Sequence, residues 1–320
     1  MTKAGRDPSP ARMQAAHSKF GAITMAPQMN RRELLLGTLA LAGPGTVPKY
    51  RIIDPHVHVW VNDPRYPWAK EATAPHKKDA TPEMLLALMR ANNVARTVLV
   101  QVITYRWDNR YVADVLKQYP RDFKGVCRVN PEDPAAPDAL SQLVEQGFRG
   151  VRISPAADSS GDWINGDLMP PLWKRTQSLK VPMQVYTSIN RLPDVARLVE
   201  KYPDLDVIID HMADCPVDQP QELDKLLALA RYPRVFVKIS HTWSISKQPY
   251  PWLDAQEHVK RLYAVYGPKR LMWGTDWPVH EANTVYSKTL SVVRDDMKFL
   301  NEEDKSWILS KTIERIWQFA

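Results

Sequence analysis

The chain has 320 residues, of which 44% are apolar and 25% charged, and its formal net charge is +7. These proportions are typical of a globular protein with a sizeable core, and two cysteines, Cys127 and Cys215, are too few for a disulfide framework. Residues 1–42 carry a net charge of +4, and the rest of the chain contains no block of lysine and arginine. We therefore expect no nucleic-acid partner, and no apolar run reaches the roughly 20 residues of a membrane span.

Residues 1–48 are expected to precede the folded domain. Residues 1–29 are polar and without periodicity, and "NRRELLLGTLALAG" follows at 30–43. Paired arginines, a short apolar run and an A-x-A pattern at 40–42 are typical of a twin-arginine export signal. We expect a periplasmic or exported protein. A disordered basic leader on a cytoplasmic protein is the alternative, and Met29 competes with Met1 as the start.

From Tyr50 onward, short apolar runs alternate with amphipathic segments. The runs are rich in Val and Ile and apolar throughout, as strands buried on both faces are. Strands are predicted at 50–54, 95–101, 124–129, 149–154, 182–187, 206–210, 235–240 and 270–276.

Helices are predicted between these strands and after the last one. The first opens with Thr81 as a cap and Pro82 in the first helical position. The helical segments are 81–93, 109–120, 133–147, 170–180, 192–203, 221–233, 251–267, 287–300 and 302–319. A βα unit repeated eight times predicts an α/β fold with a single (β/α)₈ TIM barrel over residues 49–320. An open doubly wound sheet is the alternative.

The first strand runs into "IIDPHVHVW" at 52–60. Residues i and i+2 of a strand point to the same side, so His56 and His58 project together, and such a pair can hold a metal ion or polarise a substrate oxygen. Polar residues recur at the ends of the later strands, where barrel enzymes build their active sites. They are Gln101, Arg152, Ser154, Gln184, Tyr186, His211, Lys238, Ser240, His241 and Asp276. The non-periodic stretch 60–80 is expected to cover this end.

These motifs resemble the amidohydrolase-related (amidohydrolase 2) family, in the branch of 2-pyrone-4,6-dicarboxylate lactonase and the sugar-lactone and muconolactone hydrolases. The matching pieces include "IIDPHVHVW", "FRGVRIS", "VIIDHM" and "YGPKRLMWGTDWPV", and the resemblance spans residues 50–320. It implies that His56, His58, His211 and Asp276 form the reaction centre. Asp276 would be the general base that activates water. The three histidines would polarise the carbonyl or, with Asp276, bind a divalent metal such as Zn or Mn.

The sequence departs from the family pattern at strand five, where Tyr186 stands in place of a histidine of many relatives. Metal-bound and metal-free catalysis therefore both stay open. A single well-placed arginine, Arg152, favours one anionic group over a dicarboxylate. The residues expected to contact substrate are Arg152, Tyr186, Gln101, His241, Trp60 and Trp277.

The sequence thus predicts a hydrolase that opens a small lactone, with a small-molecule substrate and no assigned oligomeric state. A metal-dependent non-oxidative decarboxylase of the same family and a non-catalytic binding protein are the alternatives. Lys238 is interpreted either as a catalytic base or as a lysine paired with a carboxylate inside the barrel. His76 and His280 are expected on the solvated surface.

Overall fold

The computed structural model describes residues 50–72, 76–155 and 161–319. The leader predicted at 1–48 lies outside these residues. These described residues belong to one compact unit. Among the described helices, none is long and apolar enough to cross a membrane.

The described residues contain eight strands, each overlapping a predicted one. All pair in parallel, in the orders β1-β2-β3 and β4-β5-β6-β7-β8. Their bounds are β1 Ile52–Val57, β2 Val94–Val100, β3 Phe123–Val126, β4 Val151–Ile153, β5 Met183–Val185, β6 Val207–Ile209, β7 Val235–Lys238 and β8 Leu271–Met272. Most are shorter than predicted, because the polar residues at their carboxyl ends leave the sheet and turn into the loops.

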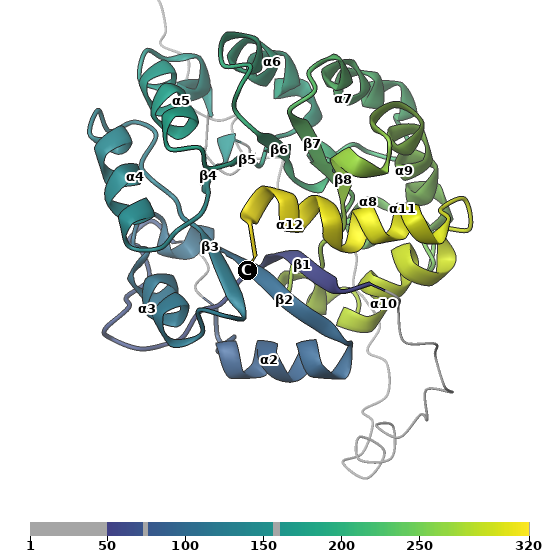
Figure 1. Cartoon of the computed structure of the whole chain (residues 1–320), viewed down its shortest axis with the longest axis horizontal. Helices are drawn as coiled ribbons and strands as arrows, with labels where there is room; N and C mark the ends of the chain where they lie inside the picture. The colour runs from purple at the N-terminus through teal and green to yellow at the C-terminus, as the bar shows by residue number, and fades with distance from the viewer. Residues whose placement is uncertain (1–49, 73–75, 156–160, 320) are drawn as a thin grey trace, which may run out of the picture. The chain divides into compact units, whose positions relative to one another are not determined.

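Backbone hydrogen bonds join the two sheets into a closed ring. Between β3 and β4, the Cys127 amide donates to the Gly150 carbonyl (2.9 Å), and the Arg152 amide donates to the Cys127 carbonyl (2.8 Å). Between β8 and β1, the Asp276 amide donates to the His56 carbonyl (2.9 Å). The His58 amide then donates to the carbonyl of Trp277 (2.7 Å). The predicted TIM barrel is therefore confirmed, and helices surround the strands (Figure 1).

The helices follow the predicted order, but π-helical turns at 292–296 and 307–311 interrupt the helices predicted at 287–300 and 302–319, and two further differences are described below. The bounds are α2 Pro82–Ala91, α3 Arg110–Gln118, α4 Ala136–Glu145, α5 Met169–Ser178, α6 Leu192–Lys201, α7 Asp224–Leu227, α8 Thr242–Ile245, α9 Leu253–Tyr266, α10 Tyr286–Ser291, α11 Glu302–Ser306 and α12 Thr312–Trp317. The helix predicted at 221–233 is α only at α7, because 3₁₀ turns replace its first and last turns. Helix α8 was not predicted.

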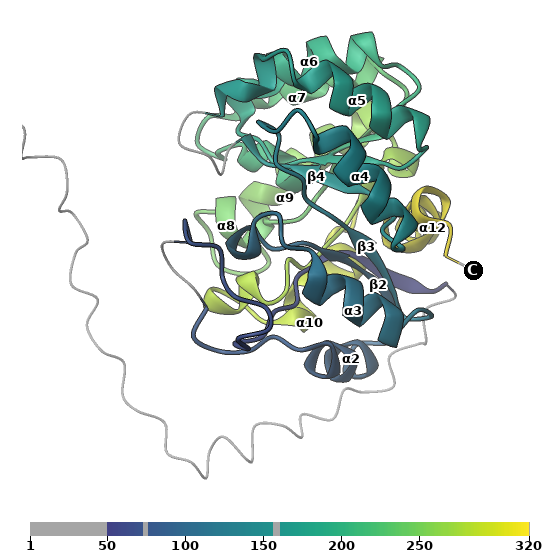
Figure 2. The same cartoon turned by 90° about the vertical axis from the view of Figure 1, so that its left-hand side faces the viewer.

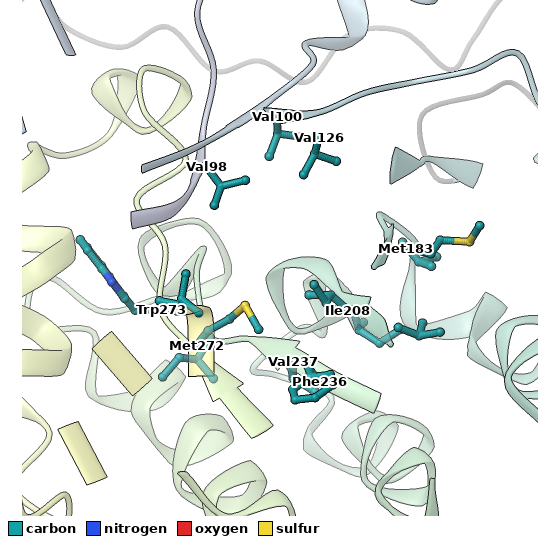
Figure 3. Close-up of a cluster of buried hydrophobic side chains, with 14 of the residues drawn as sticks. Val98, Val100, Val126, Met183, Ile208, Phe236, Val237, Met272 and Trp273 are labelled. Carbon is teal, nitrogen blue, oxygen red and sulfur yellow. The ribbon is translucent and has the colours of Figure 1, made fainter. Parts of the chain in front are cut away.

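The two ends of the barrel are closed differently. Figure 2 shows α8, which follows β7, at the carboxyl ends of the strands and α12 at the opposite end. Buried apolar side chains pack around the strands, and the close-up in Figure 3 shows Val98, Ile208, Val237 and Met272 among them. A packed interior holds the strand ends rigidly, so polar side chains there keep fixed positions.

Candidate active site

The four residues predicted to form the reaction centre lie together at the carboxyl ends of β1, β6 and β8. The Nε2 atoms of His58 and His56 lie 3.0 Å and 3.6 Å from Asp276 Oδ1. The rings of His56 and His211 have centroids 4.5 Å apart. All four side chains are buried, the most exposed at 4%. The structure therefore brings together residues that are 220 positions apart in the chain.

Left-handed backbone conformations position several of these side chains. Residues 211–214 form a turn, here called the 211–214 turn, in which every residue has a φ between 45° and 55°. His241 and Asp276 have φ values of 65° and 60°. Such angles cost a residue other than glycine about 1–2 kcal/mol, and strain of this kind clusters at functional sites. The 211–214 turn places His211 beside His56 and Asp214 beside His241.

His241 links Asp276 to a second carboxylate. Its Nδ1 lies 2.8 Å from Asp214 Oδ1 and its Nε2 lies 2.9 Å from Asp276 Oδ2, while its ring stacks on His211 at 3.6 Å. Burial alone would lower the pKa of His241, but the two carboxylates raise that pKa to about 9. His241 is therefore an imidazolium at neutral pH that donates from both nitrogens. His241 was predicted to contact the substrate, but in the structure it is bonded to Asp276, the candidate base.

Asp276 is ionised in this setting. Burial alone would raise its pKa, but hydrogen bonds from His241 and His58 hold the pKa well below the ordinary value. Its Oδ2 is occupied by His241, and its Oδ1 faces the other histidines. A carboxylate held ionised and aimed at a cluster of imidazoles is suited to accept a proton from a water molecule.

The contact between His58 and Asp276 requires a cation. His58 Nδ1 lies 2.7 Å from the Val100 carbonyl oxygen and can contact it only as a donor. A neutral His58 would then turn the lone pair of Nε2 toward Asp276 Oδ1, which is also an acceptor, at 3.0 Å. Two acceptors at this distance share either a proton, which makes His58 an imidazolium, or a metal ion.

The donor atoms also fit a divalent ion by position. His56, His58 and Asp276 each offer an atom within 4.8 Å of the others, as do two further groups, His56–Asp210–His211 and His211–His241–Asp276. Two imidazoles and a carboxylate are a ligand set found in zinc enzymes. Among the described residues, however, the four predicted ligands do not form a single group.

A buried layer of charge lies deeper in the barrel. Arg152 Nε donates to Asp210 Oδ2 (2.8 Å), and Lys238 Nζ lies 3.1 Å from Asp210 Oδ1. Burial alone would raise the pKa of Asp210, but Lys238 and Arg152 hold the pKa well below its ordinary value, whereas burial lowers the pKa of Lys238 to about 8. Of the two interpretations of Lys238, the structure supports the paired lysine. Arg152 likewise already has a carboxylate partner.

His56 and His211 are neutral imidazoles. Burial, with the nearby Lys238 ammonium, lowers the pKa of His56 well below its ordinary value. Burial, with the nearby His241, does the same to the pKa of His211, whose Nδ1 lies 2.7 Å from Ser240 Oγ. Neutral imidazoles can donate one hydrogen bond each without adding charge to the site.

Tyr186 adjoins the cluster. Its ring lies 4.9 Å from the Arg152 guanidinium and 5.7 Å from the His211 ring. Burial raises its pKa to about 12, so its hydroxyl stays protonated and can donate.

The other three predicted substrate contacts are engaged in the surrounding structure. Gln101 Nε2 donates to the Asp108 carbonyl (2.6 Å), and Trp277 Nε1 donates to Glu281 Oε1 (2.8 Å). Trp60 donates to the Lys78 carbonyl and stacks on His76 at 3.6 Å. These residues secure the loops around the site.

Two histidines differ from the prediction of a solvated surface. His76 packs between Trp60 and Trp68, because the loop after β1 folds back over these rings. His280 is fully buried, since a 3₁₀ turn, Val279–Ala282, begins directly after the strand-eight motif and turns the side chain inward. Its ring centroid lies 6.1 Å from that of Tyr286.

Arg128, two residues after β3, was not among the predicted site residues. Its side chain is 1% exposed, its Nη1 donates to Ser154 Oγ, and its guanidinium lies 5.4 Å from the Trp107 ring. A signal was present in the sequence, because Arg128 is a charged residue near the carboxyl end of the strand predicted at 124–129.

Sequence analysis also missed three aspartates that organise the site. Asp210 and Asp214 pair with the cations described above. Asp54 accepts from Thr275 Oγ1 (2.5 Å), the Tyr286 hydroxyl (2.9 Å) and the His56 amide (3.1 Å). Burial raises the pKa of Asp54 to about 6 in spite of these bonds. Asp54 stands in the first motif, so its position was a usable signal, whereas the role of Asp214 depends on the left-handed turn.

Comparison with known proteins gives evidence on the family of the chain. A family model described as Amidohydrolase matches residues 53–319. The L-fucono-1,5-lactonase of Burkholderia ambifaria is 29% identical over 234 residues, which cover 71% of this chain and 80% of that protein. The 2-pyrone-4,6-dicarboxylate hydrolase of Comamonas testosteroni is 26% identical over 241 residues, covering 71% of this chain and 76% of that protein.

A solved structure shares the fold. It is an amidohydrolase from Burkholderia multivorans with bound zinc, 20% identical, with a TM-score of 0.73 over 84% of this chain and 99% of that one.

Proposed function

The chain belongs to the amidohydrolase family, and from this premise we propose that it hydrolyses the ring ester of a small lactone. The observation that carries the proposal is the ionised Asp276 facing three buried histidines at one end of the barrel. Curated relatives named as lactone hydrolases support the same reaction class.

In the proposed reaction Asp276 acts as general base. It accepts a proton from a water molecule, whose oxygen then bonds to the lactone carbonyl carbon. Hydrogen bonds from the imidazoles and from the Tyr186 hydroxyl stabilise the tetrahedral oxyanion. The acyl C–O bond of the ring then breaks, and the departing alkoxide takes the proton from Asp276. The product is an open-chain hydroxy acid.

A divalent ion held by His56, His58 and Asp276 would act as a Lewis acid on the carbonyl. The requirement for a cation between His58 and Asp276 supports such a site, and an imidazolium His58 meets the same requirement. Metal dependence is therefore a property to be measured with the activity.

We propose that the substrate carries one carboxylate. Arg128 supports this assignment because it lies at the mouth end of β3, next to the strand of Arg152, and a guanidinium binds a carboxylate through two parallel hydrogen bonds. Arg152 is a second guanidinium at this end of the barrel, with its Nε bonded to Asp210.

The test is a panel of uncharged sugar lactones and monocarboxylated lactones, whose hydrolysis is measured as proton release with and without a chelator. We expect turnover that is faster for the carboxylated members. A parallel arm measures CO₂ release from aromatic carboxylic acids. Decarboxylation without lactone hydrolysis would contradict the proposal, as would the absence of turnover on both lactone classes.

We also propose that residues 1–48 act as an export leader. The paired residues Arg31 and Arg32 before the apolar run support it. The test compares the full chain with its Arg31→Lys/Arg32→Lys variant in fractionated bacterial cells. Loss of the periplasmic fraction in the variant is expected, and an unchanged cytoplasmic location of both chains would contradict it.

A further inference from the structure

Lys238 makes three polar contacts in the barrel interior. Its Nζ lies 2.9 Å from His56 Nδ1, 2.9 Å from Gln184 Oε1 and 3.1 Å from Asp210 Oδ1. The Lys238 side chain is fully buried, and its ammonium lies 5.9 Å from the ring of Trp317 on α12. An ammonium group has N–H bonds and no lone pair, so His56 Nδ1 and Gln184 Oε1 must accept from it, while Asp210 Oδ1 pairs with its charge.

This arrangement fixes where the proton of His56 resides. If Nδ1 accepts from Lys238, a neutral His56 carries its single proton on Nε2. Asp210 Oδ1 is the competing partner for Nδ1, but it lies 3.5 Å away, beyond the 2.9 Å contact with Lys238. Lys238 is also ion-paired to that same oxygen, at 3.1 Å.

The Nε2 atom of His56 is not engaged by the described part of the protein. It is buried and makes no hydrogen bond to any described residue, its nearest charged neighbour being Asp276 Oδ1 at 3.6 Å. An N–H group in that position lies beside the carboxylate that is proposed to activate water. A metal ligand needs the opposite arrangement, with a lone pair on Nε2 and the proton on Nδ1.

We propose that Lys238 is a positioning residue that holds the proton of His56 on Nε2. His56 is thereby made a hydrogen-bond donor to the substrate carbonyl oxygen, and it is withheld from the metal group of His56, His58 and Asp276. The donor role rests on the proposed lactone hydrolysis, whereas the position of the proton and the exclusion of metal do not. Lys238 thus favours hydrogen bonding from His56 to the substrate carbonyl over metal binding by His56.

The first test reads the proton directly. Protein labelled with ¹⁵N-histidine is studied by long-range ¹H–¹⁵N correlation, and His56→Asn identifies the His56 signals. We expect a protonated Nε2 and an unprotonated Nδ1 in the wild-type protein and in Lys238→Arg, which keeps a donor. A proton on Nδ1 in the wild-type protein would overturn the proposal, whether or not any lactone is hydrolysed.

The second test reads metal affinity. Zinc binding is measured by calorimetry for the wild-type protein, Lys238→Met, Lys238→Arg and the matched control Lys124→Met. The control removes a lysine near the amino end of β3, whereas Lys238 is at the carboxyl end of β7. Removing the donor frees Nδ1 to protonate toward Asp210, so Lys238→Met should bind zinc at least tenfold more tightly than the wild-type protein. Lys238→Arg and Lys124→Met should show no such increase in zinc affinity. Equal affinity of wild-type and Lys238→Met proteins, or stoichiometric zinc on the wild-type His56, would overturn the proposal. If Lys238→Met does not fold, the wild-type and Lys238→Arg spectra decide alone.

Discussion

His241 ties the protonation of the site to the stability of the fold. It is a buried imidazolium between Asp214 and Asp276, with a pKa raised from 6.5 to about 9. The native state therefore binds a proton that the unfolded chain loses above its ordinary pKa. Stability is fully present below pH 6.5 and is lost as the pH rises through about 9.

The corresponding prediction concerns His241→Asn. Urea unfolding from pH 6 to pH 9.5 should show a fall in the free energy of unfolding of the wild-type protein of up to about 3 kcal/mol that the variant lacks. The variant should be less stable at pH 6 and close to the wild type at pH 9.5. Parallel curves for the two proteins would show that His241 is not the group that titrates.

Arg128 is the residue on which substrate charge should depend. Replacing it with Met removes the guanidinium but keeps much of the side-chain volume. We expect Arg128→Met to raise KM for a carboxylated lactone at least tenfold, since charge-assisted bonds are worth about 1.5–3 kcal/mol, and to leave KM for an uncharged lactone within a factor of two. An equal effect on both substrates would indicate a structural role alone.

At the level of residues, the ligand-type side chains could be predicted but their partners could not. His56, His58, His211 and Asp276 follow apolar runs, and strand periodicity places such residues at one rim. The charge state of Asp276 depends on His241 and Asp214. These two meet only because of a left-handed turn that the residue types in it do not predict. Non-glycine residues in that conformation are rare, so sequence preferences point away from it.

At the level of elements, Asp54 joins the first strand to the last. Its carboxylate accepts from Thr275 and Tyr286, which lie beyond β8, and from the His56 amide of β1. The same stretch carries the backbone bonds that close the barrel. The pair of histidines is therefore held in place by the closure of the ring itself.

This contact predicts the effect of Tyr286→Phe. Loss of the hydroxyl removes a hydrogen bond to a buried carboxylate, so the free energy of unfolding should fall by about 1.5–3 kcal/mol. The matched control is Tyr66→Phe, which removes a similar bond to the exposed Asp114 and should cost about 0.5 kcal/mol or less. Equal losses in the two variants would mean that Asp54 does not depend on Tyr286.

The elements themselves were largely predictable, because continuous Val- and Ile-rich runs and 3.6-residue periodicity are strong signals. The exceptions have physical causes. Segment 221–233 has a helical pattern, yet 3₁₀ turns take over where the helix packs between its neighbours. Helix α8 is a single turn, too short to show any periodicity.

At the level of the whole molecule, barrel closure brings residues 56 and 276 into contact. Eight parallel strands present their carboxyl ends to one rim, and the apolar side chains packed around the strands keep that rim rigid. The catalytic proposal depends on this geometry and on the ionised carboxylate of Asp276 within it.

The most direct test is the turnover of Asp276→Asn on the best lactone of the panel, with the exposed Asp138→Asn on α4 as the matched control. Asn keeps the size of the side chain but cannot accept the proton, so kcat should fall by about 10²–10⁴-fold while the circular dichroism spectrum is retained and the control keeps full activity. A folded Asp276→Asn protein that turns over the lactone within tenfold of the wild-type rate would contradict the account.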